Sequence, residues 1–381
     1  MIKGKKPFET PEHRQERIKK MIHKVETEKA EASIAIGYGV LNDSVATASQ
    51  MSNIEFPDSK DDIYLSWIGA GLGIGVTGGI TILFDYAPLL LDVFDGWQYY
   101  REYLEKTPSM KGNQINTWNG NWIAHRYGRY FDETDPAYGV CSLEKTTEEL
   151  LNLPTVMWTK VLLGIALKHS MTEMLVGYLY NIGQTNTTIG FIPFRLEEIY
   201  RPNLFYERIF GTSDFSKNIH QIEKLYGTAF GLKAACQYGS IGVRAMEPKG
   251  LKDFLPKKED TKKIGYKNDE EQKITFNTYL IWILAMLNNE KLWGISRETA
   301  ELLLKYEAGA KSARTDRKNK VNKLLESATE KQFLLNMIPI IEDEQEKEPY
   351  ENLGKMVHAM PRDNFSYFNT LIRFQYALLN K

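Results

Sequence analysis

The chain has 381 residues, more than one hydrophobic core ordinarily holds, so we expect two domains. Its content of 43% hydrophobic and 25% charged residues is typical of a soluble globular protein. A net charge of −1 excludes a general basic field, so any binding to nucleic acid has to use local patches. Two distant cysteines and a charged N-terminal stretch argue against a disulfide framework, a zinc site and a secretory signal, so we expect a cytoplasmic protein.

The N-terminal half predicts a mixture of helices and strands. Thr10-Pro11-Glu12 has the capping hydroxyl, the proline and the acid of a helix start, and this helix is expected to run to about Ala32. β-Branched or aromatic runs at 63–67, 79–84 and 187–193 are typical of short strands. Apolar segments at 156–168 and 171–182 predict two further helices.

A charged segment at 256–272 separates this half from a helical one. It mixes lysines with acids and holds few apolar residues, so we expect a solvated linker. After it, the apolar run 279–287 predicts a buried helix, and further helices are expected at 296–309, 311–328, 331–341 and 364–379. The predicted fold is therefore α+β, with a mixed domain at 1–255 followed by a helical bundle at 273–381.

The glycine-rich stretch 69–79 is open to three interpretations. Gly73 to Gly78 match GxGxxG, which in a Rossmann-like enzyme would bind NAD or S-adenosylmethionine. Asp92 or Asp95 follows at a tolerable distance, but the β-branched residues after the motif and Pro88 disfavour the helix that such a site requires. This enzyme is therefore kept as the alternative.

The other two interpretations are a membrane span and a close-packed backbone site. The uncharged segment 63–84 has the length of a span, about 20 residues, but it is rich in Gly, Ser and Thr, acids flank it, and we expect no membrane insertion. Glycines that let RNA, DNA or a partner subunit approach the backbone are the better interpretation. The glycines expected at that contact are Gly71, Gly73, Gly75 and Gly78.

Basic, aromatic and amide side chains are interleaved from 111 to 130. Arg and Lys pair with phosphate, aromatic rings stack on bases, and Asn or Gln reads base edges. Asn119-Gly120 is a strong signal for a two-residue hairpin turn that would probe duplex DNA, although a hairpin with core tryptophans and only a polar tip is equally compatible. The candidate contacts are Lys111, Asn113, Gln114, Asn116, Trp118, Asn119, Arg126 and Arg129.

A second basic segment lies on the helix predicted at 311–328. Several of its cations share a helical face, with only Asp316 opposing them, so they could line a phosphate track or form an ordinary solvated face. The candidate cations are Lys311, Arg314, Arg317, Lys318, Lys320 and Lys323.

No catalytic set is recognisable in the sequence. The six histidines are scattered without the spacing of a metal site, and neither the GxSxG elbow nor the GxxxxGK[ST] phosphate loop is present. We therefore expect no enzyme, no cofactor and no metal.

Three segments resemble a known family. They are GQTN (183–186) leading into TIGFIP (188–193), LYGTAF (225–230) leading into GSIG (239–242) and EPKGL (247–251), and the ending from NF (364–365) to LIRFQY (371–376). Together they are similar to the compact large subunit of the subtype I-A CRISPR interference (Cascade) complex.

The resemblance implies a mixed N-terminal domain, a C-terminal helical bundle and a non-catalytic role. Such a subunit helps to recognise the short motif beside the target, opens the duplex, holds the displaced strand and receives the helicase-nuclease. Guide base pairing reads the sequence, while the protein supplies motif and backbone contacts. The implied partners are the other effector subunits, guide RNA, target DNA and the helicase-nuclease.

Overall fold

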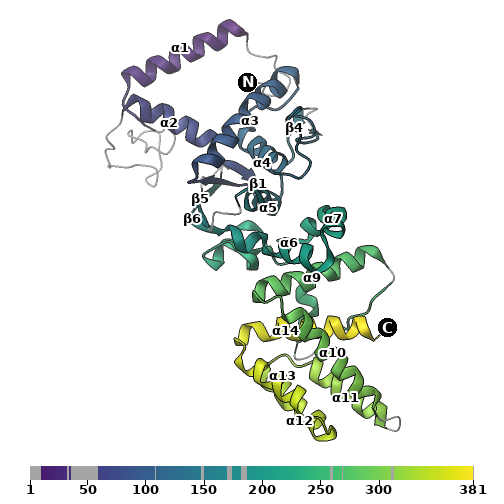
Figure 1. The fold of residues 1–381 in the computed structure, drawn as a ribbon. Coiled ribbons are helices and arrows are strands. Elements are labelled where there is room, and N and C mark those ends of the chain that lie inside the picture. The colour runs from purple at the N-terminus through teal and green to yellow at the C-terminus, as the bar shows by residue number, and fades with distance from the viewer. Residues whose placement is uncertain are drawn as a thin grey trace. The chain divides into compact units, whose positions relative to one another are not determined.

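The computed structural model describes residues 10–31, 34–35, 59–107, 109–146, 150–169, 174–181, 187–257, 261–267, 269–309 and 313–380. The chain divides into two compact units, unit 1 (Met1–Leu196) and unit 2 (Glu197–Lys381). Unit 1 combines helices with a small antiparallel sheet, and unit 2 is helical (Figure 1). The predicted α+β fold with a helical C-terminal region is confirmed.

Unit 1 alternates helices with short strands. Its helices are α1 (Pro11–Thr27), α2 (Lys60–Gly71), α3 (Ala87–Lys106), α4 (Ile115–Arg126) and α5 (Trp158–Lys168). Its strands are β1 (Ile74–Val76), β2 (Ile80–Phe84), β3 (Glu144–Lys145), β4 (Leu151–Asn152), β5 (Met174–Asn181) and β6 (Thr187–Arg195). Two of these elements contradict the sequence prediction, because the expected strand at 63–67 is part of α2 and the expected helix at 171–182 contains β5.

The main sheet has the order β1-β2-β5-β6 and is antiparallel throughout. Successive residues of a strand point to opposite faces. One face forms the core of the sheet, where Ile82, Phe84, Leu179 and Phe194 are at most 1% exposed. A Cβ on Gly177 would lie 2.8 Å from the Phe194 ring and 2.9 Å from Ile82, so this core is closely packed.

Unit 2 is built from helices joined by short connections. Its helices are α6 (Leu196–Phe210), α7 (Thr212–Leu225), α8 (Leu232–Ala235), α9 (Glu270–Leu287), α10 (Leu292–Ala308), α11 (Arg314–Leu325), α12 (Glu330–Asp343), α13 (Glu348–Ala359) and α14 (Arg362–Leu379), with 3₁₀ turns η2 (Cys236–Tyr238), η3 (Val243–Met246) and η4 (Leu251–Phe254). As predicted from its apolar sequence, α9 is buried on all sides from Thr278 to Ala285. It packs against α7 and α14.

The charged segment 256–272 is not a free linker where the structure describes it. The Tyr266 hydroxyl donates to the Phe374 carbonyl at 3.3 Å, and Arg373 Nη2 donates to the Lys262 carbonyl at 2.7 Å. Lys262 Nζ also lies 4.5 Å from the centre of the Phe254 ring. The charged side chains hid these backbone and aromatic contacts, and the division of the chain falls earlier, between Leu196 and Glu197.

Within the described part of the chain, no helix combines the length and the apolar character needed to cross a membrane. The uncharged segment 63–84 is divided instead between α2 and the β1–β2 hairpin.

Candidate nucleic-acid interface

The hairpin predicted at Asn119-Gly120 is wrong, because both residues lie inside helix α4. Asn119 is fully buried, and its Nδ2 donates to the carbonyls of Gly71 at 2.7 Å and Gly73 at 2.9 Å. Its Oδ1 accepts from Trp97 Nε1 at 3.1 Å. These tertiary hydrogen bonds outweigh the local turn preference of the Asn-Gly pair.

Other members of the amide-rich segment also hold unit 1 together. Asn116 Nδ2 donates to the carbonyls of Ala70 at 3.0 Å and Gly73 at 2.9 Å. Gln114 is buried, and its Oε1 accepts from the Leu153 backbone at 2.8 Å. Trp118 is fully buried and donates to the Gly96 carbonyl. Of the predicted amides, Asn113 is the exposed one.

The predicted cations of this segment differ in how far they are committed to internal contacts. Arg126 Nη2 lies 2.6 Å from Asp92 Oδ1, and its guanidinium lies 5.7 Å from the centre of the Trp122 ring. It therefore fixes the end of α4 against α3. Lys111 and Arg129 lie in the loops before and after α4, and both are exposed.

The glycines permit close approach of the chain's own elements. A Cβ on Gly75 would lie 2.9 Å from the Asn116 carbonyl group, and a Cβ on Gly120 would collide with the Gly75 oxygen. Helix α4 therefore crosses β1 at a point where both elements have a glycine and neither carries a side chain. A Cβ on Gly71 would lie 2.8 Å from the Trp97 ring, whereas Gly78, with φ of 94°, forms the turn between β1 and β2.

The GxGxxG segment forms an antiparallel hairpin rather than a phosphate-binding turn. Strand β1 lies inside the motif, and the residues after Gly78 continue into β2, which pairs with β1. A dinucleotide-binding turn requires a helix N-terminus directly after the glycines. This geometry gives the Rossmann-like alternative no support.

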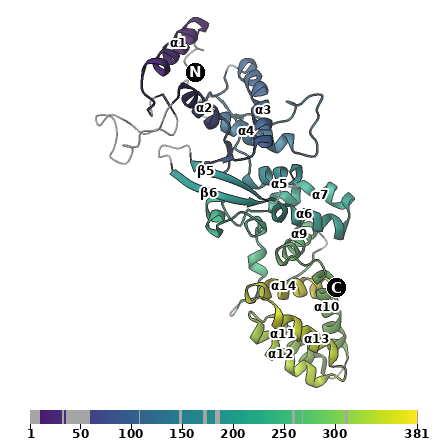
Figure 2. The same cartoon turned by 60° about the vertical axis from the view of Figure 1, so that its left-hand side comes forward.

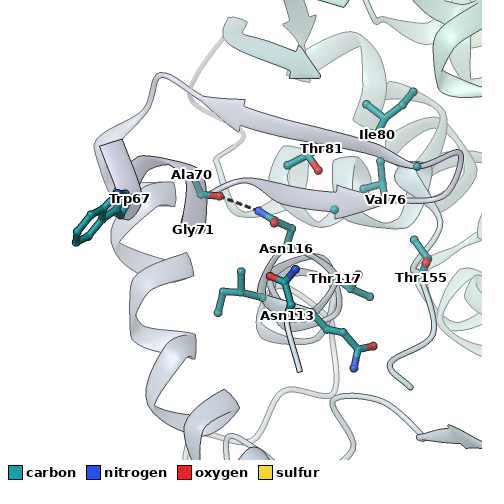
Figure 3. A pocket seen from close by; sticks show the side chains of 14 residues that line it. Trp67, Ala70, Gly71, Val76, Ile80, Thr81, Asn113, Asn116, Thr117 and Thr155 are labelled. Atoms are coloured by element: carbon teal, nitrogen blue, oxygen red, sulfur yellow. Dashed lines mark hydrogen bonds between the residues drawn. The ribbon is translucent and has the colours of Figure 1, made fainter. Parts of the chain in front are cut away.

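The glycine-rich stretch and the amide-rich segment both line a groove of about 510 Å³. Figure 3 shows Asn113, Asn116 and Thr117 at the start of α4 on one side, facing the β1–β2 hairpin with Thr81 on the other. Trp67 lies at one end of the groove. None of its lining residues is charged, so its chemistry is that of amides, hydroxyls and backbone groups.

The outer face of β5 and β6 carries the second part of the site, an aromatic face defined by Tyr178, Tyr180 and Phe191. The Tyr178 and Tyr180 rings stack with their centres 5.5 Å apart, and the Phe191 ring lies 5.1 Å from Tyr178. Phe191 is 74% exposed, and Val176 and Met174 continue the same face at 37% and 53% exposure. Figure 2 shows β5 and β6 as two long strands side by side.

The aromatic face and the groove adjoin each other on one side of the sheet. Tyr180 pairs with Thr81, and Thr81 pairs with Gly75 on β1. The Tyr180 hydroxyl also lies against Gly73, so close that a Cβ there would collide with it. Burial raises the pKa of this hydroxyl, with a smaller contribution from Tyr178.

Helix α11 holds all but one of the other predicted cations, and two of them, Arg317 and Lys320, are paired closely with acids of unit 2. Arg317 donates to the Tyr306 carbonyl at 2.8 Å and to Glu344 at 3.1 Å, and Lys320 pairs with Asp343 at 2.7 Å. The hydrogen bond from Lys320 lowers the pKa of Asp343 and raises that of Lys320.

The remaining described cations of this segment are more accessible to a ligand. Arg314 lies 3.9 Å from Glu307 and is 70% exposed at its side chain. Lys318 and Lys323 are exposed and form no ion pair with another described residue. Lys311 lies outside the described residues.

Among the described side chains, no group of three or more His, Cys, Asp and Glu residues is placed to hold a metal ion. Compared with known proteins, the chain matches no family model, no curated protein and no solved structure.

Proposed function

We propose that this chain is a non-catalytic nucleic-acid-binding subunit of a CRISPR effector complex. In this role it contacts target DNA beside the adjacent motif, holds the displaced strand and receives the helicase-nuclease, with guide RNA and the other effector subunits as partners. The resemblance of the segments at 183–193, 225–251 and 364–376 to the large subunit of subtype I-A supports the assignment to this complex.

The observation that carries the nucleic-acid part of the proposal is the aromatic face. Every base has a π-face, so aromatic rings on an open sheet bind single strands with little sequence preference. RNA-recognition modules use a four-stranded sheet with exposed aromatic rings in this way. Phe191 offers such an exposed ring on a four-stranded antiparallel sheet, and the half-buried rings of Tyr178 and Tyr180 lie beside it, next to a polar groove.

The geometry favours single strands over intact duplex. Bases in a duplex are stacked on each other and hide their faces from the protein, whereas a displaced strand exposes them. A sheet that binds unpaired bases would stabilise the opened state of the target. Lys318, Lys323 and Arg314 on unit 2 would add a sequence-independent attraction to phosphate.

The direct test compares binding of the purified chain to a labelled duplex with a single-stranded bubble and to the fully paired duplex, over a salt series. We expect preference for the bubble. Phe191→Ala should weaken binding by about 1–3 kcal/mol, or about 5- to 150-fold, through the loss of one stacked base.

The matched control is Tyr138→Ala, which removes an aromatic side chain that is 79% exposed and lies outside the sheet. It should leave the affinity unchanged. Equal affinities of wild type and Phe191→Ala for the bubble, at all salt concentrations, would contradict the proposal.

A further inference from the structure

The main sheet of unit 1 contains a single charged residue, and it lies on the aromatic face. Arg195 is the last residue of β6 and the only charged residue within the bounds of β1, β2, β5 and β6. In the register of β5 and β6, Arg195 pairs with Met174, and Phe191 pairs with Tyr178. Residues an even number apart in a strand point to the same face. Arg195, four residues after Phe191, therefore belongs to the aromatic face.

The burial of the neighbouring residues agrees with this orientation. Ile192, Phe194 and Leu196 are at most 9% exposed and point into the core, whereas Phe191 and Arg195 are exposed. A strand rises about 3.3 Å per residue, so the two Cα atoms of Phe191 and Arg195 lie roughly 13 Å apart along β6. The ring and the cation thus mark two points of one exposed surface.

The surface between these two points is apolar. On β5, Val176 is 37% exposed and Met174 is 53% exposed, and both lie on the aromatic face. Proteins that bind single strands combine rings that stack on bases with cations that follow the phosphate backbone. A ring, an apolar stretch and a cation in a row fit this pattern, and the positive charge of Arg195 complements a phosphate.

The chemistry of arginine suits a phosphate contact at this position. A guanidinium has five N–H donors in a planar fork, and it can bind two oxygens of one phosphate. Arg195 also has an interaction within the chain. Such an interaction can orient the side chain, and five donors are enough to serve an internal contact and a ligand together.

We infer that Arg195 binds a backbone phosphate of the single strand whose bases stack on the aromatic face, and thereby fixes where that strand lies along β6. The inference rests on the proposed function. It names a phosphate contact within unit 1, in addition to the general attraction by the cations of α11.

The test compares two thymidine oligonucleotides of equal length, one with the natural phosphodiester backbone and one with a neutral methylphosphonate backbone. Both offer the same bases for stacking, so their affinity ratio reports backbone recognition. We expect Arg195→Gln to reduce the preference for the phosphodiester strand about tenfold, the value of one hydrogen bond to a charged group. The salt slope for this strand should fall by about 0.7, the contribution of one phosphate of a single strand.

Two further variants serve as controls. Arg101→Gln makes the same change on α3, where the Arg101 side chain is 75% exposed and pairs with Glu105 of its own helix. It should keep the wild-type preference. Arg195→Lys retains the positive charge and should keep the wild-type salt slope. An unchanged preference in Arg195→Gln, or an equal loss in Arg101→Gln, would overturn the phosphate contact.

A purely structural role of Arg195 has a different signature. If Arg195→Gln lowers the unfolding temperature and weakens binding of both strands by the same factor, Arg195 supports the sheet and the phosphate contact is overturned. The expected result is a loss confined to the phosphodiester strand, at an unfolding temperature close to that of wild type.

The same measurements separate this inference from the proposed function. If Phe191→Ala weakens binding of both strands while Arg195→Gln changes nothing, the aromatic face stands and the phosphate contact is overturned. If Arg195→Gln reduces the preference while Phe191→Ala changes nothing, the phosphate contact stands and base stacking on the face is overturned. If neither strand binds to wild type, both are overturned.

Discussion

At the scale of single residues, Asn119 is an amide whose type suits base recognition but whose hydrogen bonds are formed within the protein. Its three hydrogen bonds connect α4 to Trp97 and to the carbonyls of Gly71 and Gly73. Trp118 and Gln114 are similarly buried, Asn116 is half-buried and donates to the Ala70 and Gly73 carbonyls, and of the predicted amides Asn113 is the exposed one. Residue type alone did not distinguish these roles, because burial depends on distant partners.

Asn119→Ala should therefore destabilise the protein rather than alter base contacts. The Gly71 carbonyl and Trp97 Nε1 would lose their partner, whereas the Gly73 carbonyl keeps its bond from Asn116. We expect a loss of about 2–4 kcal/mol in the free energy of unfolding, measured by urea denaturation. Asn113→Gly, which keeps a residue that tolerates a φ of 64°, should change stability little.

A different pattern would return Asn119 to the binding surface. If Asn119→Ala unfolds at the same urea concentration as wild type but binds the bubble duplex more weakly, the hydrogen bonds of Asn119 with Gly71 and Gly73 do not contribute measurably to the free energy of unfolding.

At the scale of elements, local signals predicted the helices of unit 2 better than the strands of unit 1. The apolar segment of α9 is buried on all sides, and its prediction as a buried helix is confirmed. In unit 1, the helix start at Thr10, which depends only on neighbours in sequence, is confirmed as well. Strand β5 was predicted as a helix, because residues on both its faces are apolar and the alternation of period two is hidden. Its pairing with β2 depends on residues far away in the sequence.

Because the period-two pattern of β5 is hidden in the sequence, the aromatic face was not predicted either. The aromatic face consists of residues two apart, Tyr178 and Tyr180, together with Phe191 from the next strand. Only the pairing of β5 with β6 brings the three rings together. The groove was not predicted, because the glycine-rich stretch and the amide-rich segment were separate candidates in the sequence. The structure brings them together mainly to pack α4 on β1.

Helix α11 provides a test of the electrostatic contribution. Replacing Lys318 and Lys323 by Glu should weaken binding to the bubble duplex and flatten its salt dependence by about 0.7–0.9 for each phosphate that is no longer neutralised. Stability should be nearly unchanged, because both side chains are exposed and form no ion pair with another described residue. Titrations by fluorescence anisotropy at several salt concentrations measure both effects.

The control for this change is the pair Lys331→Glu and Lys355→Glu, which makes the same charge reversal at exposed positions of α12 and α13. An equal loss of affinity in the control would show that net charge, rather than α11, governs binding. Arg317→Glu is unsuitable as a binding probe, since Arg317 is 15% exposed at its side chain and pairs with Glu344.

At the scale of the whole molecule, the fold class was predictable and the division of the chain was not. The change from mixed to helical patterns gave the α+β fold, which the structure confirms. The boundary lies between Leu196 and Glu197, where β6 continues into α6 without a loop, so no linker composition marks it. The charged segment 256–272 resembled a linker, but residues such as Tyr266 bind it to unit 2.

This division separates the two predicted nucleic-acid contacts. The aromatic face and the groove belong to unit 1, and the cations of α11 belong to unit 2. Base stacking is therefore assigned to one unit and sequence-independent phosphate attraction to the other. We therefore expect recognition of unpaired bases to depend on the rings of unit 1.

The most direct measurement of that claim is photo-crosslinking of the full chain to a single strand that contains 4-thiothymidine, followed by mass spectrometry of the linked peptides. We expect links to Tyr178, Tyr180 or Phe191, and their loss in Phe191→Ala but not in Tyr138→Ala. Links confined to α11 and the rest of unit 2 would contradict it.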